Sequence, residues 1–590
     1  MIERADTALS ERRAIVEERR YIAAMSRPSR RDFLYVIRNL AALPVVYAAT
    51  GCGSDPAGDD GEAGTSDGES GGDGDGDVDD GLPDYEYDGE LGPEDLFADG
   101  VASGDPTAEG VILWTRLSSA ESNDLVTGAE VFVEVSEFSD FNFRVVAEFH
   151  AVDAARDNIL KLDLQGLEAG KTYYYRFSAL GRISPVGRTR TLPTGTLDHL
   201  RFAIASCGSY QHGYFHAYER ISERKDLAAV VHLGDYIYEY EPGGYGDFRD
   251  HDPPKECIEL QDYRQRYRQY RREFGLQQAH RQHPFIVIWD DHEFANDAWQ
   301  EGAENHSVSE ADWETRKAEA AQAFFEWQPI REGEDFVIYR KFAFGDLMDL
   351  MMLDTRIIGR HEQVSSVGDA DAINDPERSL LGETQAAWLE DQLSSSTARW
   401  QVLGQQVMMG QFKIVGAPNS EGGGNILIAD QWDGYGHSRQ RLWDHVRSED
   451  IRNFVVLTGD IHSSWAMDLT EDPNNPDYYN PETGEGSLGV EFVTTSISSD
   501  FDFLNNSGTQ FILDANPHLK VLDFESRGYV VMDLTPDRIQ GDWFFIDDVT
   551  DLEGGAEMWA FGFACADMAR HMVAADDMAP EMADAPELAP

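Results

Sequence analysis

Four short apolar runs of this 590-residue chain each end beside residues that commonly bind metals. They span residues 202–206, 230–233, 284–289 and 454–457. Short apolar runs closed by Gly, Asp or Ser are typical of strands buried on both faces. The residues that follow these runs include Cys207, Asp235, Tyr238, Asp291, His292, Asp460 and His462. Because the carboxyl ends of such strands meet in one crevice, we expect these side chains to converge.

The donor types indicate a two-metal centre. A carboxylate such as Asp235 can bridge two cations, and the phenolate of Tyr238 is a hard anionic donor suited to ferric iron. Cys207 would add a thiolate and His462 an imidazole. Each residue alone has an ordinary alternative, since a Cys after a strand is often a small apolar residue and an Asp after Gly is often a turn residue. Their occurrence together at four strand ends predicts a metal site.

Three further residues complete the predicted chemistry. Carboxylates of Asp291 and Asp460 suit a hard second cation such as calcium. A two-metal centre activates water and stabilises the attacking and leaving oxygens of an in-line displacement. His292, beside Asp291, could then protonate the leaving group or stabilise the pentacoordinate phosphorus. The sequence therefore predicts a metal-dependent hydrolase.

Arg356 follows another apolar run, in Leu353-Asp354-Thr355-Arg356. Arginine matches phosphate oxygens bidentately, so a catalytic phosphate clamp is one hypothesis. A structural ion pair is the alternative.

The composition restricts the class of partner. With 41% hydrophobic residues the chain is globular, and its formal net charge is −61. Such acidity argues against a nucleic-acid scaffold role, because phosphate binding requires Lys and Arg.

Residues 1–51 differ from the rest in being basic, and they read as a twin-arginine signal built around Arg30 and Arg31. The apolar stretch that follows is too short and interrupted to be a comfortable transmembrane helix. Residues 49–52 resemble a bacterial lipobox ending at Cys52. We expect export by the twin-arginine machinery to the periplasm or cell surface, with the protein either lipid-anchored through Cys52 or secreted. A disordered basic leader is the alternative.

Four further segments are expected after this leader. Residues 52–92 are rich in Gly, Asp, Glu and Ser and predict a disordered acidic linker. Short alternating strands predict a small immunoglobulin-like β-sandwich over 93–195, and strands alternating with helices predict an α/β domain over 196–549. Residues 550–590 are expected to be a frayed C-terminal tail. If Cys52 is lipidated and Cys207 is a ligand, Cys257 and Cys565 either form a disulfide or remain unpaired structural thiols.

Together these stretches resemble the PhoD-type alkaline phosphatases, a branch of the calcineurin-like metallophosphoesterases. The matching stretches, in the expected order, are 100–106, 206–210, 234–240, 289–293, 353–356, 404–408, 459–465 and 527–529. The resemblance covers about 94–549 and implies a four-layer αββα sandwich preceded by a β-domain. The Asp-Tyr motif at Asp235 and Tyr238 and the Asp-Asp-His-Glu motif at 290–293 are its specific parts.

The resemblance also implies the metals and the reaction. Ferric iron (Fe3+) would be held by Cys207, Asp235, Tyr238 and His462, and calcium (Ca2+) by Asp235, Asp291 and Asp460. Gln406 and Asn296 are further candidate calcium ligands. The expected protein is a monomeric exported phosphatase that hydrolyses small phosphate monoesters, diesters or both. The alternatives are a phosphodiesterase specific for phospholipid or wall-polymer phosphates and a catalytically silent calcium-binding surface lipoprotein.

Overall fold

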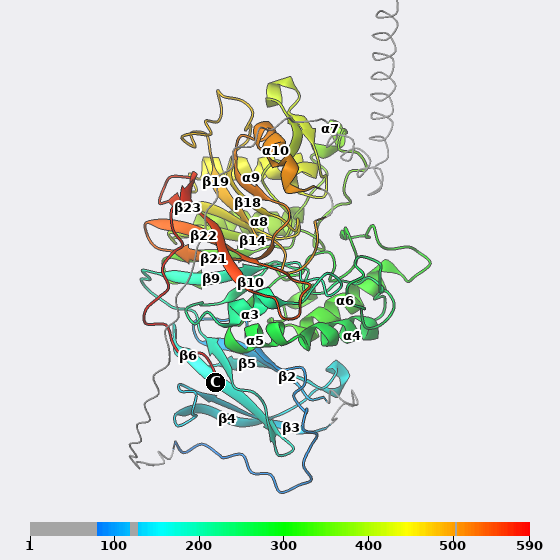
Figure 1. The fold of residues 1–590 in the computed structure, drawn as a ribbon, viewed down its shortest axis with the longest axis vertical. Helices are drawn as coiled ribbons and strands as arrows, with labels where there is room; N and C mark the ends of the chain where they lie inside the picture. The colour runs from blue at the N-terminus through cyan, green and yellow to red at the C-terminus, as the bar shows by residue number, and fades with distance from the viewer. Residues whose placement is uncertain (1–79, 119–127, 502–503) are drawn as a thin grey trace, which may run out of the picture. The chain divides into compact units, whose positions relative to one another are not determined.

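The structure, a computed structural model, describes residues 80–118, 128–501 and 504–590 (Figure 1). Contacts group residues 82–590 into one unit. The predicted leader, Cys52 and the linker as far as residue 79 lie outside the described residues.

The larger sheet has ten strands, and its centre contains three of the predicted buried strands. In spatial order the strands are β24 (Met572–Ala575), β23 (Glu557–Ala566), β22 (Arg538–Ile546), β21 (Arg527–Leu534), β9 (Leu200–Ala205), β10 (Val230–His232), β11 (Pro284–Val287), β1 (Val101–Gly104), β2 (Gly110–Arg116) and β5 (Ile159–Gln165). Strands β9, β10 and β11 are adjacent and parallel. Their carboxyl ends therefore lie side by side.

The fourth predicted strand lies in a second, seven-stranded sheet. Its order is β12 (Arg340–Phe344), β13 (Met348–Met352), β14 (Trp400–Gln405), β17 (Phe454–Thr458), β19 (Gly489–Val493), β18 (Ser464–Leu469) and β20 (Leu519–Asp523). Alternation along β13 shows how this sheet packs: Leu350 joins the core shared with the ten-stranded sheet, whereas Met351 packs on the opposite side. The mixed α/β class of this region is confirmed.

Helices cover the two sheets. The core that contains Met351 also contains residues of α8 (Gly382–Ser395) and α9 (Gly436–Ser448). Figure 1 shows another group of helices between strands β9, β10 and β21 on one side and strands β2, β5 and β6 on the other: α3 (His216–Ser222), α4 (Leu260–Arg271), α5 (Phe274–Gln282) and α6 (Trp313–Trp327). The shorter helix α10 (Thr509–Ala515) contacts β15 (Lys413–Gly416), which pairs with β16 (Gly424–Ile426) in a two-stranded sheet. Another short helix is α7 (Ala370–Ile373).

The N-terminal β domain is present, but it is not a separate sandwich. Its five-stranded sheet contains β4 (Arg144–Ala151), β3 (Glu130–Ser136), β6 (Thr172–Ala179), β7 (Arg182–Ile183) and β8 (Gly187–Arg190). The strands that face this sheet, β1, β2 and β5, continue the ten-stranded sheet through parallel pairing of β1 with β11. The expected boundary at 195 therefore does not separate two independent sheets.

The linker prediction is wrong at its carboxyl end. Within the predicted segment 52–92, the Tyr85 ring stacks on Phe132 with centroids 5.7 Å apart, and its hydroxyl accepts a hydrogen bond from the Gly181 amide at 2.8 Å. The Gly92 amide donates to the Leu180 carbonyl at 2.9 Å. Ring stacking and hydrogen bonds thus hold Tyr85 and Gly92 against the β domain despite the acidic composition before them.

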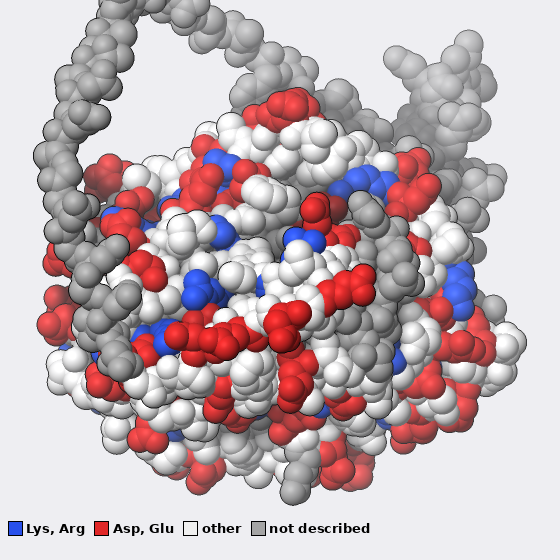
Figure 2. All heavy atoms as spheres, turned by 90° about the horizontal axis from the view of Figure 1, so that it is seen from below, with Lys and Arg blue, Asp and Glu red and all other residues white. Residues whose placement is uncertain are grey.

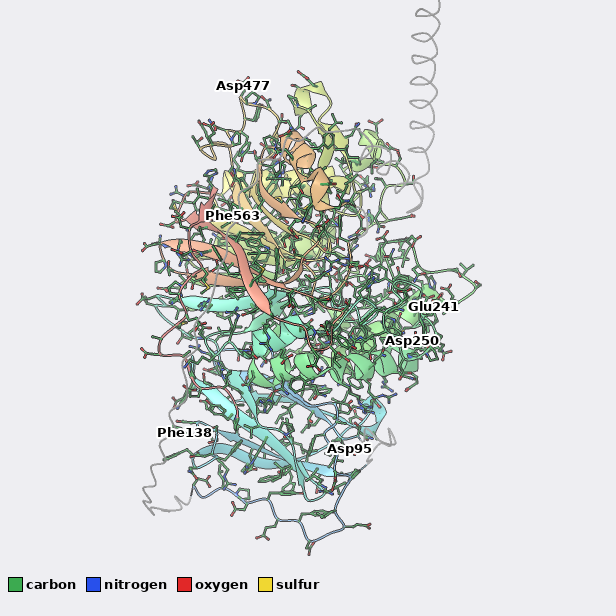
Figure 3. All side chains as sticks on the ribbon, in the orientation of Figure 1. Asp95, Phe138, Glu241, Asp250, Asp477 and Phe563 are labelled. Atoms are coloured by element: carbon green, nitrogen blue, oxygen red, sulfur yellow. The ribbon has the colours of Figure 1, made fainter. Side chains whose placement is uncertain are left out.

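The predicted frayed tail, 550–590, is also wrong. Residues 557–575 supply strands β23 and β24, and Phe563 and Cys565 enter the main core (Figure 3). The chain then returns to the β domain (Figure 1), where the Tyr174 hydroxyl donates to the Glu587 carbonyl at 2.7 Å. Edge-strand pairing and burial therefore order this segment.

The cysteines, the lengths of the helices and the surface charge complete the description. Cys257 and Cys565 are buried free thiols, so the structure favours the alternative of unpaired structural cysteines. Among the described residues, no helix combines the length and apolarity needed to cross a bilayer. Figure 2 shows acidic side chains spread over the displayed face, with basic side chains in smaller groups.

Candidate metal centre

The predicted ligands converge where the two sheets meet. Cys207 follows β9, Asp235 and Tyr238 follow β10, and Asp291 follows β11, all at the carboxyl ends of adjacent strands. Asp460 and His462 follow β17 of the facing sheet. Two sheets thus bring together residues more than 200 positions apart in the sequence, as in the contact of Tyr238 with His462.

One group of donors contains Cys207, Asp235, His462 and Tyr238. Ligand atoms of the first three lie within 4.8 Å of one another. The Tyr238 hydroxyl donates to Asp235 Oδ2 at 3.0 Å and lies 3.2 Å from His462 Nε2. Asp235 Oδ1 is buried without a hydrogen-bond partner in the protein. Since a buried unpaired carboxylate oxygen is costly, this atom fits a site for a cation.

Cys207 and Tyr238 also need a nearby cation if they are to be deprotonated and bind as anions. Burial, and then the Asp235 carboxylate, raises the pKa of the Cys207 thiol well above its usual value. The same two causes raise the pKa of the Tyr238 phenol. A coordinated metal ion is the kind of charge that deprotonates such groups in a buried site.

Two further donor groups adjoin the group that contains Cys207. Asp235, Asp291 and His292 form one cluster, and Asp290, Asp291 and Asp460 form another. Asp235 belongs to the group with Cys207 and to the group with Asp291. This shared position fits the bridging role predicted for Asp235.

Four of the predicted ligands have left-handed backbone conformations. The φ angles are +59° at Cys207, +55° at Asp235, +62° at Asp460 and +54° at His462. Such angles are uncommon for residues other than Gly and cluster at functional sites, where the surrounding fold maintains them. The sharp turns after the strands direct these side chains towards one another.

Gly234 is required by this geometry. Its φ is +103°, and a Cβ atom there would lie 2.4 Å from Asp290 Cβ and 2.6 Å from the Asp290 nitrogen. We expect Gly234→Ala to displace Asp235 and to lower metal affinity by about 10–100-fold, the range seen when the support of a ligand is lost. Metal content measured by elemental analysis tests this.

Gly166→Ala is the matched control, because Gly166 has φ +88° and nothing within 4 Å of its Cβ position. If the two variants retained the same metal content, packing at Gly234 would not support the site.

His462 and His292 are each oriented by an acceptor at Nδ1. His462 Nδ1 donates to the Asp500 carbonyl at 2.9 Å, which leaves Nε2 facing Tyr238 and Asp235. His292 Nδ1 contacts Glu239 Oε2 at 2.8 Å. An acceptor at one ring nitrogen determines which nitrogen remains for a ligand or a proton transfer.

Glu239 is a functional candidate that the sequence analysis did not single out. Burial opposes charge on His292, but Asp291, Asp235 and Glu239 together raise its pKa to about 10. Glu239 is fully buried and also accepts from the Asn296 amide at 2.9 Å and from Asn305 Nδ2 at 2.8 Å. The feature of the sequence that could have identified Glu239 was its place in the 234–240 motif. Glu239 thus fixes the orientation of the His292 ring through Nδ1.

Arg356 does not act as a free phosphate clamp in this structure. It is fully buried and forms ion pairs with Asp290 and Asp460 and, at 2.7 Å, with Asp430. All three guanidinium nitrogens are engaged by carboxylates. The structure therefore favours the structural ion pair over the clamp.

Arg360 and Asp430 extend this ion-pair network and were not found from the sequence. Arg360 pairs with Asp430, which also accepts from Gln363 at 2.7 Å. Although burial opposes it, Arg356 and Arg360 hold the pKa of Asp430 below its usual value. Two buried guanidinium groups thus neutralise carboxylates beside the candidate centre.

Of the two further calcium ligands suggested from the sequence, Gln406 is not available. Its Oε1 accepts from the Thr355 amide and hydroxyl, and its Nε2 donates to the carbonyls of Trp289 and Leu353. Gln406 therefore joins strand ends through both ends of its amide group. Asn296 stays a prediction.

Comparison with known proteins agrees with this geometry. Residues 202–543 match the family model described as PhoD-like phosphatase, and residues 89–193 match PhoD-like phosphatase, N-terminal domain. The chain is 38% identical over 474 residues to alkaline phosphatase D of Bacillus subtilis (strain 168), covering 77% of this chain and 78% of that protein.

A solved structure titled "Structure of PhoD" is also similar. It shares 34% sequence identity with a TM-score of 0.75, covering 84% of this chain and 94% of that one. The donor clusters fit the metal dependence of this family. The family resemblance read from the sequence is thereby confirmed: the chain belongs to the PhoD-like phosphatases, as an enzyme homologous to alkaline phosphatase D.

Proposed function

We propose that this enzyme hydrolyses phosphate monoesters, diesters or both at a centre of ferric iron and calcium. Cys207, Asp235, Tyr238 and His462 would hold the iron, and Asp235, Asp291 and Asp460 the calcium. The observation that carries the proposal is the convergence of thiol, phenol and imidazole donors on Asp235, whose Oδ1 has no other partner. The thiol of Cys207 and the imidazole of His462 lie in the proposed iron group, whereas carboxylates alone supply the proposed calcium ligands.

The chain's own residues prepare the reaction. When bound, the metals supply activation of water and stabilisation of charge on the phosphoryl oxygens. His292, oriented by Glu239 through Nδ1, would donate a proton to the departing alcohol. Arg356 keeps the neighbouring carboxylates in place by neutralising them.

The test is hydrolysis of a phosphate monoester and a diester by purified protein, before and after chelation. We expect hydrolysis, followed through release of the alcohol, that chelation abolishes and that iron plus calcium restores, whereas magnesium alone does not. Undiminished hydrolysis by protein free of both metals would overturn the proposal.

For the fold, we propose the four-layer αββα order. The shared core of the two sheets and the helices α8 and α9 on the outer side of the smaller sheet support it. An experimental structure that placed these helices between the sheets would contradict it.

We also propose that residues 1–51 direct twin-arginine export and that Cys52 is lipidated. The order of twin arginines, apolar stretch, lipobox-like residues and acidic spacer supports this. Replacing Arg30 and Arg31 by Lys should retain the enzyme in the cytoplasm, and Cys52→Ala should move it from the membrane to the soluble fraction. If the Cys52→Ala protein sedimented with membranes as the parent does, the anchor would be refuted while export could stand.

A further inference from the structure

A fifth strand end reaches the candidate centre, and it carries none of the predicted ligands. Strand β19, labelled in Figure 1, lies next to β17 in the seven-stranded sheet and runs parallel to it, so their carboxyl ends adjoin. Residues 496–500, Ser-Ile-Ser-Ser-Asp, follow β19 after two threonines, and we call them the serine turn. The serine turn therefore lies beside the turn after β17 that carries Asp460 and His462.

The serine turn is hydrogen-bonded to the turn that carries Cys207. The Ser498 hydroxyl donates to the Ser209 carbonyl at 2.8 Å. The Cys207 carbonyl accepts from the amide of Ser499 at 3.3 Å and from the amide of Ser498 at 3.4 Å. These bonds help to maintain the left-handed backbone of Cys207, which the surrounding structure has to support.

Ser499 also contacts a predicted iron ligand with its side chain. Ser499 is fully buried, and its Oγ lies 2.8 Å from the Cys207 carbonyl oxygen and 2.7 Å from the phenol oxygen of Tyr238. The carbonyl of the next residue, Asp500, accepts a hydrogen bond from His462 Nδ1 at 2.9 Å. Two adjacent residues thus touch three of the predicted iron ligands, and the Ser499 hydroxyl does so at the donor atom of Tyr238 itself.

Ser499 is the hydrogen-bond donor among the polar neighbours of the Tyr238 oxygen. Within the described part of the chain, this oxygen has three such neighbours: Asp235 Oδ2, His462 Nε2 and Ser499 Oγ. An ionised carboxylate only accepts, and His462 Nε2 also accepts because Nδ1 carries the ring hydrogen to Asp500. A phenolate at Tyr238 can therefore receive a hydrogen bond from Ser499 but not from the other two groups.

The hydroxyl of Ser499 carries one hydrogen, which can rotate towards either of two acceptors. With a neutral phenol at Tyr238, this hydrogen can go to the Cys207 carbonyl. With a phenolate, donation to Tyr238 is favoured, because hydrogen bonds to an ionised acceptor are about twice as strong as those between neutral groups. The Cys207 carbonyl loses little by this change, since the amides of Ser498 and Ser499 still donate to it.

We propose that Ser499 is a positioning residue of the iron site, which donates a hydrogen bond to the phenolate oxygen of Tyr238 and withdraws charge from this ligand. The inference rests on the proposed iron centre and deepens it by naming the residue that sets the donor strength of the phenolate. Partners that hydrogen-bond to a metal ligand tune the metal in this way. A weaker phenolate donor would leave the iron better able to polarise bound water.

The test compares Ser499→Ala with Ser498→Ala in protein loaded with ferric iron and calcium. Each change removes a serine hydroxyl that contacts a backbone carbonyl of the 207–209 segment, but of the two hydroxyls that of Ser499 alone contacts Tyr238. Charge transfer from a phenolate to ferric iron absorbs visible light at an energy that falls as the phenolate becomes a stronger donor. Ser499→Ala should therefore move the absorption maximum to longer wavelength and lower iron affinity about 10-fold. Ser498→Ala should retain the wild-type maximum.

Ser499→Thr keeps a hydroxyl and should keep the wild-type wavelength and iron affinity. An unchanged maximum in iron-loaded Ser499→Ala, or equal shifts in both alanine variants, would overturn the inference. If Ser499→Ala binds no iron, Ser498→Ala and Ser499→Thr must bind it as wild type does, and a loss of iron in either of them overturns the inference. Wild type without an iron-dependent band that Tyr238→Phe weakens would instead refute the proposed iron site.

Discussion

Asp235→Ala is expected to abolish phosphoester hydrolysis. Asp235 is shared by the donor groups of Cys207 and Asp291, so its loss removes a ligand from both predicted metals. The fall in kcat/KM should exceed the about 10–100-fold typical of losing only the support of a ligand. Tyr238→Phe should retain more activity, because Tyr238 belongs to one group only. Steady-state kinetics with metal analysis of both variants measures the difference.

Asp477→Ala serves as the control for this comparison. Asp477 is exposed on a distant loop (Figure 3), and its replacement should leave rate and metal content unchanged. Equal residual activity in Asp235→Ala and Tyr238→Phe would count against the bridging role.

Arg356→Met is expected to destabilise the fold strongly. The change leaves Asp290, Asp430 and Asp460 buried or half-buried around an uncharged side chain. Breaking a buried ion pair by removing one partner costs about 3–5 kcal/mol of unfolding free energy. Denaturant unfolding of chelated protein would measure this loss.

Arg441→Met is the matched control, because Arg441 pairs with Glu383 and Glu390 at a partly exposed site. Such a pair contributes about 0–1 kcal/mol. If Arg356→Met instead raised the KM for phosphoesters without loss of stability, the result would support the phosphate-clamp hypothesis for Arg356.

The local part of the site could be predicted from the sequence. Asp235 follows one apolar strand, and Asp291 and His292 follow another, so each pattern lies within one short segment of the sequence. The sheet then brings the ends of these strands together. The positions of these predicted residues therefore followed from strand order alone.

The ion-pair network could not be predicted in the same way. Arg356 and Asp430 are 74 positions apart, and nothing in either segment shows that they meet. An arginine after an apolar run suits a phosphate and a buried carboxylate equally well, so only packing distinguishes the two roles. Pairing of β1 with β11 is a similar case, since it joins Ser103 to Pro284.

The C-terminal strands did leave a signal in the sequence. Trp559, Phe561, Phe563 and Cys565 alternate with smaller or polar residues, which is the period of a half-buried strand. The Ala, Asp and Met content of the surrounding segment obscured this alternation. Composition is a weaker guide than periodicity at the end of a chain.

The most direct test of the metal centre is elemental analysis of purified wild-type protein beside Cys207→Ser. We expect iron and calcium bound to wild type, with visible absorption from the iron, and loss of iron with retained folding in Cys207→Ser. Wild-type protein that is colourless, free of iron and fully active would contradict it.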